Sequence, residues 1–458
     1  MPILELRILP PMAIGRFGSS PIPLESYELK VADNDPLGFR RICPRETLEI
    51  DPASGQVARA YVPKQIRFRD QRGIRPVAPF LELFARTSED ELEPLTLDLL
   101  EADGLGPEAI RWKIDVANMK AFRQTGDQND KVIAGTGWFS DHAIKPLLGE
   151  CKNFKDGAKL PFGNVRYIKP TAEHPEIRLR FTPAEGKVYG SSLKGFDPKT
   201  GLPAKDDDPV FKDDPSRILY DPSKGTWFGF RSSNPRTTTN PSDIYEGAED
   251  VPSDGVVLGH SQGYFDDVCD GPVSVELTLK NGSKLSARAW ISACMPAFAP
   301  DSEPVRTVAD ELEQLIMGPE VDPFSGLQQE AADIVRRALE TVRLMNTAVM
   351  NGNVIHGRVN IAHTLVTQDT NDYGRFYAPV MASSMVDNLA VRALHERVYS
   401  ALLSGSAPWF SDVLRHPEEV GDLSDKGRRK MPPMLRGADS RTLALTRRQI
   451  NKVVKATK

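Results

Sequence analysis

The sequence predicts an α+β protein whose amino-terminal two thirds are mainly β and whose smaller carboxy-terminal part is mainly helical. Two observations carry this prediction. Apolar and polar residues alternate in short runs up to about residue 291, which is the pattern of half-buried strands. After Pro304, apolar residues recur at spacings of three and four, which is the pattern of an amphipathic helix. We therefore expect a mainly β region over 1–305 and a helical region over 306–458.

The clearest single element is a β-hairpin at 272–291. Two alternating apolar runs flank Asn281-Gly282, a dipeptide that favours the left-handed backbone of a type I′ turn. The alternating residues are Val273, Val275, Leu277 and Leu279 before the turn, and Leu285, Ala287, Ala289 and Ile291 after it. A further strand is expected where Ile110, Trp112, Ile114 and Val116 alternate, and shorter runs between turn signals predict more strands of antiparallel sheets in the first hundred residues.

Three amphipathic helices are expected after the β region. The first begins at Leu327, with Ala331, Ile334, Val335, Ala338, Leu339, Val342 and Met345 on one face. A second is expected over 385–403. The last begins at Thr446, which can cap it, while Gln449 can close a capping box ahead of Ile450, Val453 and Val454. By contrast, proline and aspartate interrupt the segment 195–250, which predicts a long loop that covers a site or an interface.

Composition excludes several classes of function. The formal charge of -5 gives no bulk attraction to nucleic acid or to an anionic membrane. The first residues lack a signal peptide, and no later window approaches the roughly 18 apolar residues of a membrane span. The cytoplasm is therefore the expected location. The four cysteines, Cys43, Cys151, Cys269 and Cys294, form no CxxC pair and are expected to be reduced thiols.

Motifs for common chemistry are missing from the sequence. It contains no GxGxxG segment after a strand, no GxxxxGK[ST] loop and no GxSxG elbow. The densest polar cluster lies at 354–377, and its candidate catalytic residues are His356, His363, Asp372, Tyr373 and Tyr377. Histidine and carboxylate ligands suit zinc or non-haem iron. However, the seven-residue gap between the histidines matches no ligand template, and ordinary loop and core roles are the alternative for all five, so no metal is predicted.

Cysteine and tryptophan lie close together in the hairpin region, which raises a second kind of chemistry. A tryptophan that is oxidised to a quinone and cross-linked to a cysteine sulfur supplies an electron sink that ordinary side chains lack. Trp290 with Cys294 or Cys269 is the candidate pair. The alternative is that a small thiol and a large ring fill the edge of a core.

Several blocks of the sequence occur in an order that resembles the lysine ε-oxidase and glycine oxidase family. They are LPPMAIGRFGSS, KQIRFRDQRGIRPVAPFLELF, IRWKIDVANMKAF, CKNF with LPFGNVRY, DDVCDGPVSVELTLKNG and AWISACMPAFAPD, with a shorter block, KMPPMLRGADSRTLALTRRQ, at 430–449. The resemblance covers roughly residues 5–305 and this last block. It implies the scaffold of enzymes that carry cysteine tryptophylquinone and oxidise amino acids with oxygen, releasing ammonia and hydrogen peroxide.

The sequence departs from the family where the cofactor is made. In the family, the cofactor cysteine and then the cofactor tryptophan follow the segment that 430–449 resembles, whereas only INKVVKATK follows it here. No cysteine comes after Cys294 and no tryptophan after Trp409. We therefore expect that cysteine tryptophylquinone is not formed from this chain, and no cofactor is predicted. The hairpin cysteines and Trp290 match positions that the family uses for structure, which favours packing as their role.

Two functions remain open from the sequence. The first is an amino-acid or amine oxidoreductase that uses oxygen, with quinone chemistry lost or altered. Its substrate is an amino acid or amine, and its redox group comes from a bound flavin or metal, a flavoprotein or another protein partner. The second is a non-catalytic binding or assembly protein on the same scaffold, because fold alone does not certify activity. A metal-dependent or hydrolytic enzyme built around 356–372 is a weaker third alternative.

Overall fold

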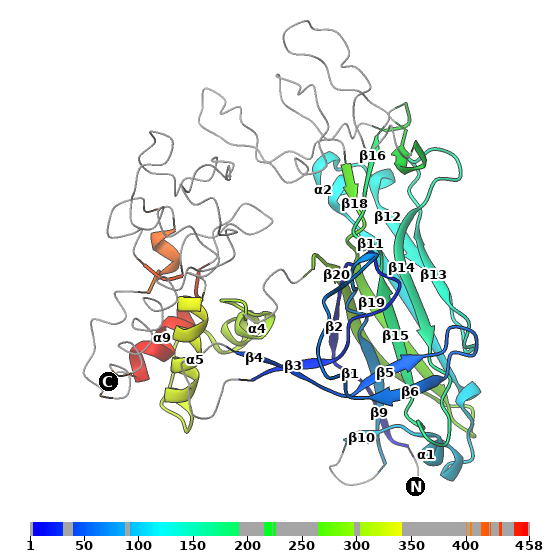
Figure 1. Ribbon diagram of the computed structural model, residues 1–458, viewed down its shortest axis with the longest axis horizontal. Helices are drawn as coiled ribbons and strands as arrows, with labels where there is room; N and C mark the ends of the chain where they lie inside the picture. Colours follow the sequence, from blue (N-terminus) through cyan, green and yellow to red (C-terminus); the bar gives the residue numbers. More distant parts are fainter. Residues whose placement is uncertain are drawn as a thin grey trace, which may run out of the picture. The chain divides into compact units, whose positions relative to one another are not determined.

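The computed structural model describes residues 3–30, 40–87, 92–191, 215–221, 223–225, 264–296, 303–340, 414–420, 430–432 and 444–456, with three single positions between them. The chain divides into two compact units (Figure 1). The first contains Met1–Glu28 and Cys43–Phe298, and the second contains Leu29–Ile42 and Ala299–Lys458. The boundary that the sequence analysis places at 305 stays a prediction.

A six-stranded antiparallel sheet forms one half of the first unit. Its strand Phe80–Arg86 alternates strictly, so that Leu81, Leu83 and Ala85 are fully buried while the residues between them are not. In spatial order the strands are β1 (Glu5–Leu9), β9 (Phe80–Arg86), β15 (Arg178–Pro183), β14 (Leu160–Tyr167) and β13 (Lys145–Gly149), with β10 (Leu92–Pro94) also paired to β9.

A five-stranded sheet forms the other half and contains the predicted hairpin. The hairpin strands are β19 (Asp270–Thr278) and β20 (Lys284–Cys294). On one side β19 pairs with β11 (Ile110–Asn118), and β11 pairs with β12 (Val132–Gly135). On the other side β20 pairs in parallel with β2 (Met12–Arg16). The sequence therefore predicts both the hairpin and the strand at 110–116 correctly.

The turn of this hairpin differs from the predicted type I′ turn. The N–H of Gly282 donates to the carbonyl of Leu279 at 2.9 Å, so the central turn residues are Lys280 and Asn281. Gly282 follows them with φ of 79°. This is the three-residue loop in which glycine takes the left-handed position after the turn. Asn281-Gly282 is compatible with both the two-residue type I′ turn and the three-residue loop. Only the register of the paired strands distinguishes the two turns.

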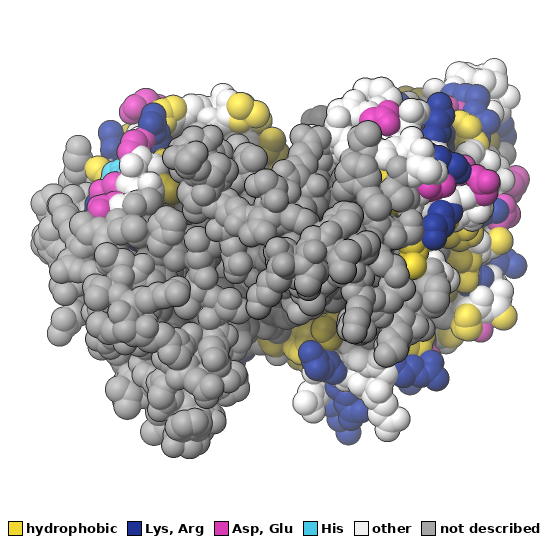
Figure 2. Space-filling model, turned by 90° about the horizontal axis from the view of Figure 1, so that it is seen from above, with side chains coloured by type: hydrophobic (Ala, Val, Ile, Leu, Met, Phe, Trp, Pro, Cys, Tyr) yellow, Lys and Arg dark blue, Asp and Glu magenta, His cyan; other side chains and the backbone are white. Residues whose placement is uncertain are grey.

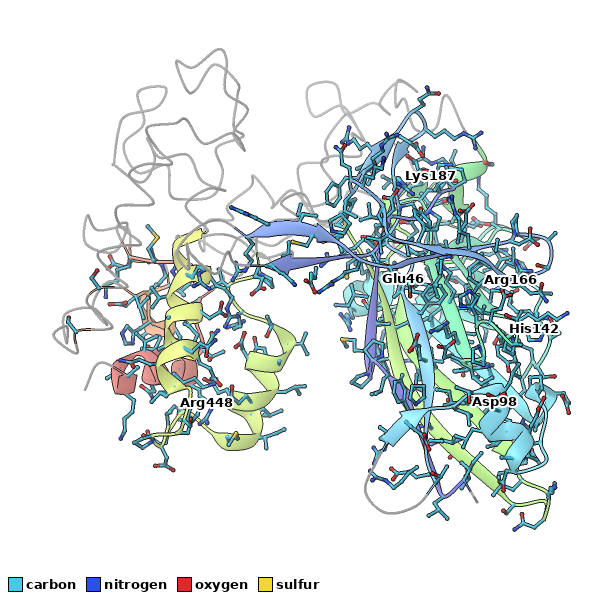
Figure 3. All side chains as sticks on the ribbon, turned by 60° about the horizontal axis from the view of Figure 1, so that its bottom comes forward. Glu46, Asp98, His142, Arg166, Lys187 and Arg448 are labelled. Carbon is cyan, nitrogen blue, oxygen red and sulfur yellow. The ribbon has the colours of Figure 1, made fainter. Side chains whose placement is uncertain are left out.

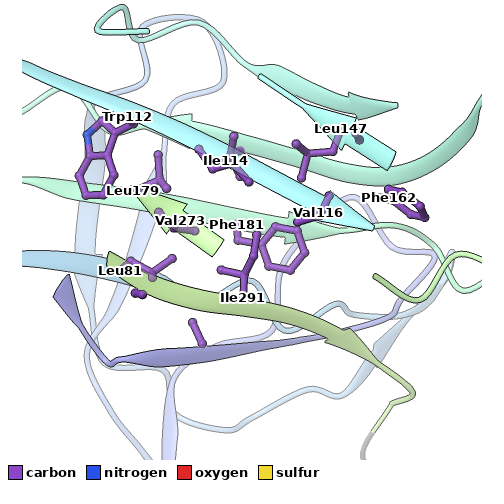
Figure 4. Packing of buried hydrophobic residues seen from close by; sticks show 14 of the residues in the cluster. Leu81, Trp112, Ile114, Val116, Leu147, Phe162, Leu179, Phe181, Val273 and Ile291 are labelled. Atoms are coloured by element: carbon purple, nitrogen blue, oxygen red, sulfur yellow. The ribbon is translucent and has the colours of Figure 1, made fainter. Parts of the chain in front are cut away.

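The inner faces of the two sheets share one hydrophobic core (Figure 4). Trp112 and Val273 come from the five-stranded sheet, and Leu81, Leu179 and Phe181 come from the six-stranded sheet; all five are completely buried. Because side chains alternate along a strand, this burial directs every second residue of the same strands to the outer faces. The polar positions between the core residues thus lie on the outer faces of the two sheets.

Short strands and helices surround this sandwich. A three-stranded sheet contains β17 (Ile218–Tyr220), β16 (Val188–Ser191) and β18 (Tyr264–Asp266), and pairs form between β3 (Tyr27–Lys30) and β4 (Arg41–Pro44), β5 (Thr47–Ile50) and β6 (Val57–Tyr61), and β7 (Arg69–Asp70) and β8 (Gly73–Ile74). The described helices of this unit are α1 (Leu97–Ala102) and α2 (Lys120–Thr125), with described 3-10 turns at Pro107–Ala109, Gln128–Asp130 and Pro215–Arg217. On the face shown in Figure 2, basic and acidic side chains are interspersed over the described surface.

Helices dominate the described part of the second unit. These are α4 (Val308–Met317), α5 (Leu327–Glu340) and α9 (Arg447–Ala456), with a 3-10 turn at Pro417–Glu419. The predicted capping box of α9 is confirmed, because the Thr446 N–H donates to Gln449 Oε1 at 2.8 Å and the Gln449 N–H donates to Thr446 Oγ1 at 3.1 Å. The helix predicted from Leu327 is confirmed over the described range, where Ala331, Ile334, Val335 and Ala338 are buried against Ile450 and Val453.

Helix α4 was not predicted, although its capping box is present in the sequence. The Thr307 N–H donates to Asp310 Oδ2 at 2.7 Å, and the Asp310 N–H donates to Thr307 Oγ1 at 3.1 Å. Its polar residues pair with the neighbouring helices, through Asp310 to Arg337 at 2.9 Å and Glu313 to Lys452 at 2.7 Å. Its apolar residues lie on the solvent side, where Val308, Leu312, Leu315 and Ile316 are between 51% and 80% exposed.

The described elements confirm the predicted fold class, since strands dominate up to residue 294 and helices dominate the described residues after 303. The helix expected over 385–403 and most of the loop 195–250 lie outside the described residues. No helix in the described ranges is long and apolar enough to cross a membrane.

The first strand offers a direct test of the shared core. Leu6 is 3% exposed, whereas Leu4, two residues earlier, is 56% exposed. Leu6→Ala should lower the free energy of unfolding by about 2–5 kcal/mol, because it removes buried methyl groups and leaves a cavity. Leu4→Ala should change it by less than about 0.5 kcal/mol. Urea unfolding of both variants measures the difference, and equal effects would show that β1 does not contribute to the core as described.

Candidate buried carboxylate site

The candidate residues from the sequence lie outside the part of the chain that the structure describes. This applies to His356, His363, Asp372, Tyr373 and Tyr377, so they stay predictions. Within the described ranges, no group of three or more histidine, cysteine, aspartate or glutamate side chains could hold a metal ion. The candidate site must therefore be sought among other buried polar groups.

Two adjacent carboxylates are buried at the junction of β18 and β19. Asp266 is 5% exposed and Asp267 is 1% exposed. The carboxylate of Asp266 is compensated, because Asn118 Nδ2 donates to its Oδ1 at 3.1 Å and Lys120 Nζ forms an ion pair with its Oδ2. Both donors come from the end of β11 and the start of α2. This pairing joins two segments that are almost 150 residues apart.

Asp267 has no cation as a partner in the described structure. Its Oδ2 accepts hydrogen bonds from the N–H groups of Gly186 at 2.9 Å and Lys187 at 3.0 Å. Its Oδ1 is shielded from solvent and accepts no hydrogen bond from any residue that the structure describes. Burial raises the pKa of Asp267 to about 7, and the Asp266 charge also acts to raise it, while the backbone N–H groups of Lys187, Gly186 and Asp267 itself act against the shift.

The backbone around Gly186 makes this arrangement possible. Gly186 has φ of 83°, a left-handed conformation that favours glycine. A Cβ atom at this position would also lie 3.0 Å from the Cβ of Phe17, so the segment passes close to a core side chain. The strand β16 that follows pairs Val188 with Asp266. Two consecutive N–H groups are thereby aimed at the Asp267 carboxylate.

A second buried carboxylate, Asp130, shows what a structural role requires. Asp130 is completely buried, yet each of its oxygens accepts hydrogen bonds. Its Oδ1 accepts from Tyr220 Oη at 2.6 Å and Asn153 Nδ2 at 2.8 Å, and its Oδ2 accepts from Thr125 Oγ1 at 2.5 Å. Such a satisfied network specifies a fold rather than a reactive group. Asp267 differs from Asp130 because one of its two carboxylate oxygens accepts no hydrogen bond from a described residue.

Two of the four cysteines, Cys151 and Cys269, have the properties of structural thiols. All four are free, as the sequence analysis predicts. Burial raises the pKa of Cys151 to about 11, and its Sγ donates to the carbonyl of Asn129 at 3.0 Å. Burial also raises the pKa of Cys269, which is 1% exposed. Because the thiolate is the reactive form, neither position suits nucleophilic chemistry.

The hairpin residues do not fit a cysteine tryptophylquinone. Trp290 lies on the outer face of β20, 41% exposed beside Met12, whereas Cys269 is buried on the inner side. Cys294 shares the outer face with Trp290 but is four residues along the same strand, which separates their Cα atoms by roughly 13 Å. A thioether needs direct contact between sulfur and indole. The packing role is thus confirmed for Cys269, while Trp290 is a surface residue rather than a core one.

Comparison with known proteins gives likenesses among solved structures only. No protein-family model matches the chain, and no curated protein matches it. The crystal structure of the L-Lys ε-oxidase from Marinomonas mediterranea is similar to 99% of this chain, with 13% identity and a TM-score of 0.47. The Schiff base intermediate of that enzyme with L-Lys gives 13% identity and a TM-score of 0.44. In both comparisons this chain spans 60% of the length of the solved chain.

The raised pKa of Asp267 predicts a specific pH dependence of stability. The ordinary value of 3.8 applies to the unfolded chain, so between about pH 4 and 7 the folded protein holds a proton that the unfolded chain has lost. This contribution to stability is complete below pH 4 and is lost as the pH rises to 7. It amounts to at most about 4 kcal/mol.

The variant Asp267→Asn removes this contribution. Wild-type stability should therefore fall relative to that of Asp267→Asn as the pH rises from 4 to 8, as measured by urea unfolding. Asp270→Asn, which removes an exposed carboxylate three residues along the chain, is the control for the loss of a negative charge. A difference between wild type and Asp267→Asn that is constant over this range would contradict a raised pKa.

Proposed function

We propose that this protein oxidises an amino acid or a primary amine, as the family that its sequence resembles does. The balanced reaction converts the amine, dioxygen and water into a carbonyl compound, ammonia and hydrogen peroxide. The position of the family-like sequence blocks in the structure supports this proposal. Phe17, Asn118 and Asp267 belong to three different blocks, and they meet around the buried carboxylates. The residues that carry the resemblance therefore build the candidate site as well as the core.

Asp267 is the described residue best suited to move a proton in such a reaction. Oxidation of an amine requires removal of a proton from the carbon that bears the nitrogen. A general base works best when its pKa lies near the operating pH. The Asp267 carboxyl has a pKa of about 7 and is fixed by two backbone hydrogen bonds to one oxygen, which leaves the other oxygen unpaired.

The redox group must come from outside the described hairpin, because its sulfur and indole are too far apart to join. A bound flavin, a redox metal or a partner flavoprotein would supply the electron acceptor, since no unmodified side chain accepts an electron pair.

A non-catalytic binding or assembly protein is the second candidate. The observation that favours it is the same mismatch in the hairpin, where a tryptophan and a cysteine share a face without contact. A scaffold that keeps its core but builds no redox group in it could still bind the same ligands. In this case Asp267 would hold a ligand rather than accept a proton.

A mass measurement and an oxygen assay separate the two. The full-length protein, purified with any bound cofactor, should release hydrogen peroxide with at least one amino acid or amine. Asp267→Asn should lower the rate by about 100-fold or more, which is the usual contribution of a general base. Asp270→Asn should leave the rate unchanged.

Intact mass identifies the redox group. A quinone cross-linked to cysteine would change the mass by two added oxygen atoms and four lost hydrogen atoms, whereas a bound flavin or metal leaves the polypeptide mass equal to the calculated value. A colourless protein of the calculated mass that consumes no oxygen with any amine would rule out the oxidase and support the binding protein.

A further inference from the structure

The outer face of the six-stranded sheet carries a row of arginines that the oxidase proposal does not use. In β15, Leu179 and Phe181 point into the core, so Arg178, Arg180 and Thr182 lie on the opposite face. Arg180 is directly opposite Arg166 of β14 and Phe80 of β9. Directly opposite residues of antiparallel strands have Cβ atoms about 5 Å apart, and like charges at this spacing repel each other.

Arg166 is fully engaged but not neutralised. Among the described residues, its guanidinium donates only to backbone carbonyls, those of His142 at 2.8 Å, Asp51 at 3.3 Å, Pro52 at 2.8 Å and Ala53 at 3.2 Å. It thus holds the turn between β5 and β6 against the sheet, close to His142 (Figure 3). Neutral acceptors satisfy its hydrogen bonds, and the nearby Asp51 carboxylate interacts with its charge without accepting a hydrogen bond from it.

Arg180 has neither a hydrogen-bond acceptor nor an ionic partner among the described residues. Its guanidinium lies over the ring of Phe80, 4.9 Å from the centroid, and its Nε is shielded from solvent without an acceptor. Burial lowers the pKa of Arg180 to about 10. This arrangement is costly, because the shielded Nε loses its hydration without gaining a hydrogen bond, and the Phe80 ring carries no negative charge.

By contrast, the neighbouring Arg178 on the same strand has carboxylate partners. Its Nε pairs with Glu82 at 2.6 Å and its Nη1 with Glu176 at 3.1 Å. These two carboxylates are thereby occupied. The three arginines and two glutamates leave this part of the sheet with an excess of positive charge at Arg180. Thr182 and Asn164, which are paired across the strands next to it, add a hydroxyl and an amide on the same side.

We propose that Arg180 binds a small oxyanion, a phosphate or carboxylate group, on the outer face of the six-stranded sheet, with Asn164 and Thr182 beside it. A guanidinium fork donates two parallel hydrogen bonds to such a group, which provides both the missing acceptors and the missing negative charge. The Phe80 ring on one side and Arg166 with its turn on the other limit the width of the site. A small anion therefore fits better than the backbone of a nucleic acid.

The test compares two arginines of the same strand. Unfolding temperature and isothermal titration of the full-length protein are measured with inorganic phosphate and, separately, with acetate, at constant ionic strength. The variants are Arg180→Met and the control Arg178→Met. We expect a saturable rise in the unfolding temperature for wild type and Arg178→Met, and a dissociation constant at least about tenfold weaker for Arg180→Met. The stronger of the two anions identifies the ligand as a phosphate or a carboxylate.

The unliganded proteins provide an independent readout. Without added anion, Arg180→Met should be at least as stable as wild type, because it removes an uncompensated charge. Arg178→Met should be less stable, because it leaves two glutamates unpaired.

If Arg180→Met does not fold, Arg180→Lys keeps the charge but loses the guanidinium fork, and it should also bind the anion at least about tenfold more weakly than wild type. The same anion response in wild type and the Arg180 variants, or no response in wild type, would overturn the proposal. The outcome of this anion-binding test does not depend on oxidase activity.

Discussion

The shared core of the two sheets is the constraint on which the rest of the first unit depends. Each strand that contributes to it must direct one set of alternate residues inward. Once Leu179 and Phe181 are buried, Arg178 and Arg180 are fixed on the outer face. Once Ile291 is buried, Trp290 lies on the outside. The separation between Trp290 and the buried Cys269 is thus a consequence of strand periodicity and not of local packing.

The buried charged side chains of the first unit are of two kinds: some have hydrogen-bond or ionic partners, and others have a polar atom without one. Asp130 and Arg178 are each satisfied by hydrogen bonds or ion pairs, and they connect segments without being reactive. Asp267 and Arg180 each have a shielded polar atom without a partner and no oppositely charged neighbour in the described structure. Native proteins rarely leave such groups unpaired, and those they leave are often functional. Other shielded polar atoms in the described structure also lack a hydrogen bond, but those on charged residues have an ion pair on the same side chain, so the proposals rest on Asp267 and Arg180.

Local patterns were enough to predict elements whose determinants are close in sequence. The hairpin, the strand at 110–116 and the capping box of Thr446 with Gln449 follow from alternation or from a spacing of three residues. The missed helix α4 had the same signal in Thr307 and Asp310. Its apolar face points to solvent, so it contributes little to the buried pattern from which helices were predicted.

The candidate site could not be predicted, because its geometry depends on strand register. Asp267 is aligned with Gly186 and Lys187, and Arg180 is aligned with Arg166, only through pairing between strands that are separated in the chain. In the sequence each is an ordinary charged residue. Whether a buried charge has a partner depends on which residues the strand register brings together. Contacts along whole strands set this register. The exact turn of the hairpin depends on register in the same way.

The protonation state of Asp267 tests the account most directly. The carboxyl carbon of this residue can be followed by NMR over a pH titration of protein labelled with ¹³C at aspartate, with Asp267→Asn used for assignment. We expect a midpoint near 7, because the carboxyl is buried without a cation beside it in the described structure. A midpoint near the ordinary value of 3.8 would show that the carboxylate is hydrated or paired, and would contradict the candidate site.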